Sequence, residues 1–191
     1  SQSYEGRGTL DNRVYFLTMG FLPRTEVSIR ATVLPGESHI EGLKADGVDR
    51  MGSGRVLILE EKPARGDSSG FPRPLALPGL AIGMDDIKGT RRYHSFYLVA
   101  TKTLAVGDGP VYGSVTAGYG FRTFRAGRYL LDGEFAGADI YLGKWAGFIV
   151  EYDSEKWSGG LRLFPAFPLT AQLALLNFDT LSGGVSWTHF F

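Results

Sequence analysis

The sequence predicts an all-β fold, and more narrowly an antiparallel up-and-down transmembrane β-barrel of twelve short strands, with ten or eight as alternatives. Three observations predict it. About eleven runs of β-forming residues are separated by turn residues, and no useful stretch shows helical periodicity. The two faces of these runs differ in polarity. Aromatic residues gather at the ends of the runs, as in the belts of a membrane barrel. Residues 1–191 are expected to form one domain.

The composition excludes several classes of protein. The 20 Lys and Arg balance the 20 Asp and Glu, so there is no basic surface for nucleic acid. Cysteine is absent, which excludes disulfides and thiolate metal sites. No run approaches the ~18 apolar residues of a membrane-spanning helix. No charged-then-apolar leader begins at Ser1, so we expect a chain whose signal has been removed or one that is not exported.

The first half of the chain contains the clearest alternation. Val27 and Ile29 share one face of an expected strand, and Ser28 and Arg30 share the other. The strands expected in this half are residues 1–10, 12–21, 25–34, 55–60, 79–85 and 93–104. Residues 1–10 are polar and broken by glycine, so they are read as a tail or as a short first strand. The connections between the others are residues 35–54, 61–78 and 86–92, with a tight turn at Pro23.

The second half ends in an aromatic strand. Its expected strands are residues 111–121, 129–139, 145–153, 158–164, 169–177 and 183–191. Trp187 and Phe191 share the apolar face of the last strand, which resembles the closing strand and insertion signal of bacterial outer-membrane barrels. This strand and residues 12–21 would run in the same direction. Antiparallel closure therefore needs one further strand, which residues 1–10 would supply. The alternative is a soluble β-sandwich with a core-packed last strand.

Aromatic residues at the strand ends favour the barrel over the sandwich. One expected rim carries Phe21, Tyr141, Trp145, Phe164, Phe167, Phe190 and Phe191. The other carries Tyr93, Phe121, Phe124, Tyr129, Tyr152, Trp157 and Phe178. Connections also alternate in length, as expected of short periplasmic turns and longer outer loops, although residues 61–78 break the rule.

Isolated charges in the middle of expected strands are candidates for the barrel lumen. They are Arg30, Asp85, Glu134, Glu151 and Arg162. The interior of a narrow barrel is filled by side chains, so opposite charges there should pair. We therefore expect a plugged, ion-paired interior. A constriction that selects a small solute is the alternative.

One segment resembles a known family. Gly83, Asp86, Gly89 and Thr90 lie at characteristic spacing and precede the pattern Tyr97-x-Val99-Ala100-x-Lys102. This pattern, with Glu151-Tyr152-Asp153 as a second element, resembles the YjbH-like outer-membrane barrels. The resemblance implies an outer-membrane location, a link to exopolysaccharide and capsule production, and no catalytic residues. From the residues alone, Gly89 is expected to supply a positive φ in a tight turn, where Asp86 accepts backbone N–H groups.

Other candidate sites are weak. The loop residues Arg122, Phe124, Arg125 and Arg128 combine charge and aromatic rings that suit lipopolysaccharide phosphates or a glycan, although a solvated loop is the simpler reading. The three histidines lack ligand spacing, so no metal site is expected. No Gly-x-Ser-x-Gly elbow occurs, and His94 with Ser95 is the one weak catalytic pair. No enzyme activity and no cofactor are expected.

These readings combine into one functional hypothesis and two alternatives. The hypothesis is a non-enzymatic β-barrel of the Gram-negative bacterial outer membrane with a structural or export-associated envelope role, exopolysaccharide-related and potentially one subunit of a larger envelope complex. Its expected partners are outer-membrane lipid, lipopolysaccharide, envelope proteins and polysaccharide, without nucleic acid. The first alternative is a porin-like small-solute channel. The second is a soluble β-sandwich binding module.

Overall fold

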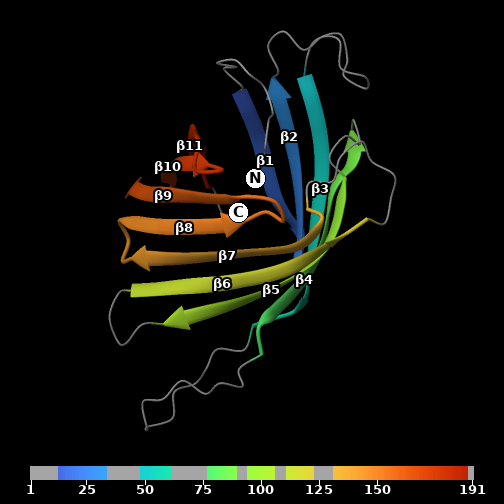
Figure 1. The fold of residues 1–191 in the computed structure, drawn as a ribbon, viewed down its shortest axis with the longest axis horizontal. Coiled ribbons are helices and arrows are strands. Elements are labelled where there is room, and N and C mark those ends of the chain that lie inside the picture. The colour runs from blue at the N-terminus through green and yellow to red at the C-terminus, as the bar shows by residue number, and fades with distance from the viewer. Residues whose placement is uncertain are drawn as a thin grey trace.

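A computed structural model describes residues 13–33, 48–61, 77–89, 94–105, 111–122 and 131–188. These residues form a single sheet in which each strand pairs antiparallel with the next along the chain (Figure 1). The strands are β1 (Arg13–Leu22), β2 (Thr25–Val33), β3 (Val48–Leu59), β4 (Gly79–Gly89), β5 (Ser95–Ala105), β6 (Val111–Phe121), β7 (Gly133–Leu142), β8 (Ala146–Tyr152), β9 (Trp157–Ala166), β10 (Leu169–Leu176) and β11 (Thr180–Trp187). The all-β, antiparallel, up-and-down prediction is confirmed.

The sheet is strongly twisted and curled. In Figure 1, β1–β3 run steeply across the direction of β6–β9, with β10 and β11 behind. Each strand runs between the two rims of the sheet, which we call the C-terminal rim and the opposite rim. The C-terminal rim holds the end of β11 and the tight turns at residues 23–24, 143–145 and 167–168. The opposite rim holds the start of β1, the end of β2 and the start of β3.

The register defines an inner and an outer face. Directly opposed residues of adjacent strands share a face. The pairs Thr32↔Asp49, Gly83↔Tyr97 and Ser114↔Asp139 lie on the inner face. The pairs Leu17↔Ile29 and Leu98↔Tyr119 lie on the outer face. Cavities lined by the inner residues of several consecutive strands show that this face is the concave one.

The outer face is apolar and open. In the described residues, 32 large apolar side chains are exposed; most of them, such as Leu17, Ile29 and Leu98, lie on this face, although a few, such as Phe16, lie on the inner one. The buried hydrophobic residues of the same ranges are only Met51 and Ala81. The most buried side chains, Thr32, Asp49 and Ser95, are polar. A water-soluble domain shows the reverse distribution, because burial of apolar surface drives its folding. Two stacked sheets with a shared apolar core, as in the sandwich alternative, are therefore not what the described residues form.

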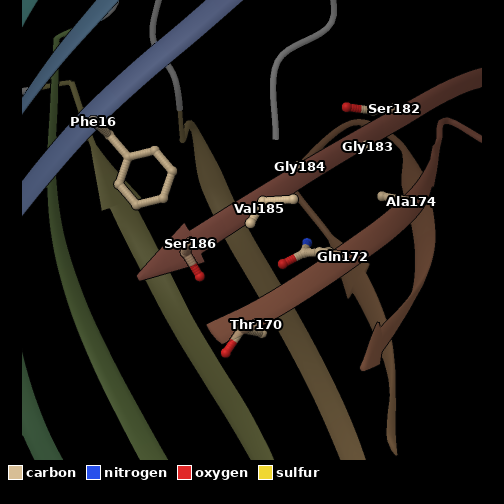
Figure 2. Close-up of a pocket in the computed structure, with 9 residues that line it drawn as sticks. All are labelled: Phe16, Thr170, Gln172, Ala174, Ser182, Gly183, Gly184, Val185 and Ser186. Atoms are coloured by element: carbon tan, nitrogen blue, oxygen red, sulfur yellow. The ribbon is translucent and has the colours of Figure 1, made fainter. Parts of the chain in front are cut away.

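The two edge strands approach each other across a small cavity. β1 and β11 both run from the opposite rim to the C-terminal rim, and no hydrogen bonds join them within the described ranges. Phe16 of β1, which lies on the inner face opposite Arg30, nevertheless lines a cavity with Val185 and Ser186 of β11 (Figure 2). We call this the seam cavity. Barrel closure stays a prediction, as does the count of twelve strands, because residues 1–10 lie outside the described part.

Two strands extend farthest beyond their predicted ranges. β3 begins at Val48, so residues 48–54, predicted as part of a connection, are half of a strand paired with β2. This segment was not predicted as a strand because it is rich in polar residues and glycine. Its inner residues face other polar side chains. β4 continues to Gly89, so the turn predicted from Asp86 is wrong for residues 86–89. Its register with β3 jumps between Gly52 and Gly54, which marks a β-bulge.

The aromatic rims need one correction. Tyr141 pairs with Gly147 and shares the face of Asp139, so it lies inside, and Phe164 follows Arg162 on the same face. The remaining described aromatic residues of the two predicted rims lie at the strand ends or turns. Those at the C-terminal rim are Trp145 and Phe167, and those at the opposite rim are Phe121, Tyr152, Trp157 and Phe178.

Candidate functional site

The opposite rim of the inner face is filled by a buried polar cluster, which consists of Thr32, Asp49, Met51, Asp86, His94 and Ser95. They come from the end of β2, the start of β3, the end of β4 and the start of β5, so four strands converge here. Each is nearly inaccessible to solvent, from 0% for Thr32 to 7% for His94. Burying polar groups is costly unless they are hydrogen bonded. The register pairs Thr32 with Asp49 and Asp85 with Ser95, which brings these strand ends together.

The β-bulge in β4 directs Asp86 into this cluster. Because Gly52 pairs with Lys88 and Gly54 with Met84, three residues of β4 oppose Ser53 alone. Asp86 takes a φ of 52°, a left-handed conformation that Asp tolerates better than most residues. Gly89 closes the bulge with a φ of 152°, and a Cβ there would collide with the carbonyl oxygen of Arg50. Only glycine fits this close approach of the two strands.

Hydrogen bonds fix the start of β5 to its surroundings. The Ser95 hydroxyl donates to the carbonyl of Leu131 at 3.2 Å and accepts the Leu131 N–H at 2.7 Å. His94 Nδ1 lies 3.3 Å from the carbonyl oxygen of Asp86. Both side chains thus hold backbone groups of neighbouring segments. The sequence singled out His94 with Ser95 as a weak catalytic pair, and the geometry gives each of them a structural contact instead.

Arg30 and Asp85 meet beside the cluster. The Ser53 hydroxyl hydrogen bonds the Asp85 carboxylate, and the guanidinium of Arg30 attracts it electrostatically. Arg30 also contacts the sulfur of Met51. These two members of the predicted lumen network are therefore neighbours on the inner face. They extend the polar cluster toward the middle of the strands.

Inner aromatic rings cover glycines of the adjacent strand. Tyr97 lies over Gly83, and Phe135 lies over Gly118, where a Cβ would collide with the ring in each case. The two rings also contact each other edge-on, with centroids 6.0 Å apart. An aromatic side chain that covers a cross-strand glycine stabilises a curved sheet. This row fills the middle of the inner face next to the polar cluster.

A comparison with models of protein families identifies the family of this chain. The model described as exopolysaccharide biosynthesis protein YbjH, of the YjbH family, matches residues 10–131, which is more than half of the sequence. The chain belongs to the YjbH family. Searches of curated proteins and of solved structures returned no match. The predicted resemblance is confirmed, and the matched range contains the whole polar cluster.

The motif that suggested the YjbH family has a structural explanation. Gly83 supports the Tyr97 ring, and Asp86 and Gly89 form the bulge, so these motif positions shape one end of the inner face. Thr90 lies outside the described residues. In the second element, Asp153 Oδ1 accepts the backbone N–H of Lys156 at 2.8 Å in the turn between β8 and β9. These contacts give the motif residues structural roles.

At the C-terminal rim the inner face contains cavities, whereas at the opposite rim its side chains are buried. A cavity of about 640 Å³ crosses the inner faces of β1–β6 and contains the ion pair between Glu26 and Arg55, with Oε2 and Nη2 3.1 Å apart. We call it the charged cavity. A second cavity, of about 760 Å³, lies between β6 and β11 and is lined by Tyr112, Trp145, Phe164 and other residues. We call it the aromatic cavity.

Glu61 caps an open strand edge beside the charged cavity. β5 extends past the start of β4, and the Glu61 carboxylate accepts hydrogen bonds there from the N–H of Thr103 at 2.9 Å and its hydroxyl at 2.7 Å. Lys102 Nζ lies 2.8 Å from Glu61 Oε1. Partial burial by itself raises the pKa of Glu61, but the hydrogen bonds from Lys102 and Thr103 outweigh it and lower the pKa.

The other predicted lumen charges are dispersed. Arg162 lies on the inner face and donates from Nη1 to the Tyr141 hydroxyl at 3.0 Å and from Nη2 to Gln172 Oε1 at 3.5 Å. Glu151 lies on the inner face, where it pairs with Ser158, and it is nearer to the opposite rim than to the C-terminal rim. Glu134 pairs with Tyr119 on the outer face, so its placement in the lumen was wrong. It lies near a strand end, where an outward charge reaches polar surroundings.

The remaining predicted sites lie at the surface or outside the described residues. Arg122 forms a bidentate ion pair with Asp132, and this hydrogen bond lowers the pKa of Asp132. Phe124, Arg125 and Arg128 of the same loop, and Phe191 of the insertion signal, are outside the described residues. Trp187 is exposed on the outer face opposite Leu169. The described residues hold no cluster that could bind a metal ion and no helix long and apolar enough to cross a membrane.

Proposed function

We propose that this protein is a non-enzymatic β-barrel of the bacterial outer membrane with a structural or export-associated role in exopolysaccharide production. One observation carries the proposal: most of the large exposed apolar side chains lie on the outer face of the sheet, and most of the buried side chains on its concave face are polar. Hydrocarbon is the solvent that stabilises such a distribution. The family description supplies the link to exopolysaccharide.

Aromatic and basic residues mark the two edges of the apolar surface. Near the opposite rim, Tyr15, Tyr119 and Trp157 are exposed and belong to the outer face. At the C-terminal rim, Trp145, Phe167 and Trp187 are exposed. Tyr and Trp favour the interface between hydrocarbon and water. Arg13, Arg50 and Lys88 also reach the outer face near the opposite rim, which suits contact with lipopolysaccharide phosphates there.

The packed end of the inner face favours a plugged interior over the small-solute channel. The buried polar cluster leaves its residues almost no solvent contact, whereas the charged cavity and the aromatic cavity lie toward the C-terminal rim. Substances could therefore enter the inner face from one rim. An assembly with envelope partners, or a rearrangement of the cluster, would be needed for passage.

Detergent extraction and conductance test the proposal. The full chain, expressed with an export signal, should be extracted from membranes only with detergent and should migrate differently on gels before and after boiling. A monomer that stays soluble without detergent would contradict the membrane proposal. In planar bilayers, we expect no steady conductance at the nanosiemens level. Such conductance would instead support the channel alternative.

A further inference from the structure

The aromatic cavity at the C-terminal rim has the features of a ligand site. Its wall holds Tyr112, Lys144, Trp145, Phe164, Phe167 and Thr170. The side chains of Trp145 and Phe167 are 75% and 80% exposed. Binding sites are commonly concave, largely apolar and supplied with a few polar groups, and the mouths of barrels are frequent locations for them. This site lies mostly beyond residues 10–131, which the family model matches.

Part of the aromatic wall is preorganised on the inner face. Tyr112 and Tyr141 stack with centroids 4.9 Å apart and an interplanar angle of 20°, and Tyr141 contacts Phe164 at 6.0 Å. Arg162 holds the Tyr141 hydroxyl, and Gly147 lets the Tyr141 ring lie against β8. The register puts all three rings inside. They therefore do not belong to the outward belts that would contact lipid.

A path of polar groups leads from this cavity into the interior. Thr170 lines both the aromatic cavity and the seam cavity. Beyond it, the seam cavity presents the hydroxyls of Ser182 and Ser186 and the amide of Gln172 (Figure 2). Hydroxyls and amides both donate and accept hydrogen bonds. An aromatic mouth that continues into such a lining suits an extended, polyhydroxylated ligand, whose ring faces stack and whose hydroxyls exchange hydrogen bonds.

The charges along this path favour an acidic ligand. Arg162 lies one inner-face position deeper than Phe164. It does not itself line either cavity, but it hydrogen bonds Gln172 of the seam cavity, and both of its partners, Tyr141 and Gln172, are neutral. Lys144 adds a second cation at the mouth. Two carboxylates of β7 and β8 share this face: Asp139 accepts a hydrogen bond from the Ser114 hydroxyl at 2.5 Å, and Glu151 lies farther away, nearer the opposite rim. Guanidinium groups bind carboxylates bidentately and strongly.

We propose that the aromatic cavity and the seam cavity together bind a segment of a carboxylate-bearing polysaccharide, which enters from the C-terminal rim. Tyr112, Trp145 and Phe164 stack on the sugar rings, and Arg162 binds a carboxylate. This inference rests on the proposed function, because it takes the exopolysaccharide as the ligand and the inner face as its location. It adds the site, the direction of entry and the charge of the sugar.

Titration of the detergent-solubilised full chain with defined oligosaccharides tests this site. Oligogalacturonate is the acidic probe and maltohexaose the neutral one, and tryptophan fluorescence in a Trp157→Phe, Trp187→Phe background reports on Trp145. We expect oligogalacturonate to bind about tenfold more tightly than maltohexaose, a difference of about 1.4 kcal/mol. Equal affinity would overturn the role of the carboxylate. No binding of either sugar would overturn the site.

Variants separate the two kinds of contact. Tyr112→Ala should weaken both sugars about tenfold, whereas Arg162→Gln should remove the preference for the acidic one. The control is Tyr119→Ala, an aromatic residue on the outer face, which should leave binding unchanged. Unchanged binding in both Tyr112→Ala and Arg162→Gln would contradict the proposal. Gel migration before and after boiling shows whether each variant folds. A detergent-extracted barrel that binds no sugar would refute this inference alone, whereas a chain soluble without detergent would refute the proposed function.

Discussion

The two ends of the inner face are built in opposite ways. At the opposite rim, Thr32, Asp49 and Ser95 are buried among the ends of β2–β5 and have almost no contact with solvent. At the C-terminal rim, the charged and aromatic cavities remain open, and rings such as Trp145 project into solvent. Tight packing of polar groups provides rigidity and a unique register, whereas open space provides room for a ligand. This difference agrees with the proposal above, in which one end stabilises the fold and the other end binds the ligand.

A glycine substitution at each end should show the largest contrast. Gly89→Ala places a methyl group against the Arg50 carbonyl in a backbone conformation unfavourable for alanine, so we expect a loss of about 3 kcal/mol or failure to fold. Gly184→Ala, where nothing lies within 4 Å of the added carbon, should change the free energy of unfolding by less than about 0.5 kcal/mol. Denaturant unfolding in detergent micelles measures both. Similar losses would mean that the two ends are equally packed.

A pair of serine substitutions gives a smaller contrast of the same kind. Ser95→Ala removes two hydrogen bonds and leaves the half-buried Leu131 backbone groups without them, so a loss of about 2 kcal/mol is expected. Ser186→Ala, beside the seam cavity, should cost less than about 0.5 kcal/mol. The same unfolding assay applies. A larger loss at Ser186 than at Ser95 would reverse the assignment of the packed end.

The third contrast, the smallest of the three, lies at the open end, in the cap on β5. Because the folded-state pKa of Glu61 lies below its ordinary 4.5, the cap stabilises the protein fully above that value and is lost as pH falls through the folded-state value. Glu61→Gln should cost about 0.5–1 kcal/mol and speed hydrogen exchange at the Thr103 amide. The control is Glu60→Gln, whose ion pair with Arg24 is more exposed. If protection of the Thr103 amide from hydrogen exchange changes neither on acidification nor in Glu61→Gln, the cap is disproved.

The difference between the two ends of the inner face also explains which strands were predicted correctly from the sequence. β2 and β6 alternate cleanly, because one face is apolar and the other polar along their whole lengths. The first half of β3 does not, since Asp49 and Ser53 face polar partners inside while glycines face out. The bulge at Asp86 interrupts the period of β4, so that strand was predicted too short.

The candidate sites were predicted less completely than the strands. Arg30, Asp85 and Arg162 could be assigned to the inner face because each interrupts an apolar run. Their partners could not be predicted, since Met51 and Gln172 are distant in sequence and only the register brings them close. The aromatic cavity was missed because Tyr141 and Phe164 were read as parts of an outward belt. The glycines opposite inner rings, such as Gly147 opposite Tyr141, are the signal that could have placed them.

The most direct test of the account is the environment of successive residues along β2 in lipid. The chain contains no cysteine, so single Ser28→Cys and Ile29→Cys variants can each carry one environment-sensitive fluorophore without background labelling. In lipid vesicles, we expect a label at Ile29 to be quenched by doxyl-labelled lipid and a label at Ser28 not to be. Protection of both labels from doxyl lipid would contradict an outer face in contact with hydrocarbon.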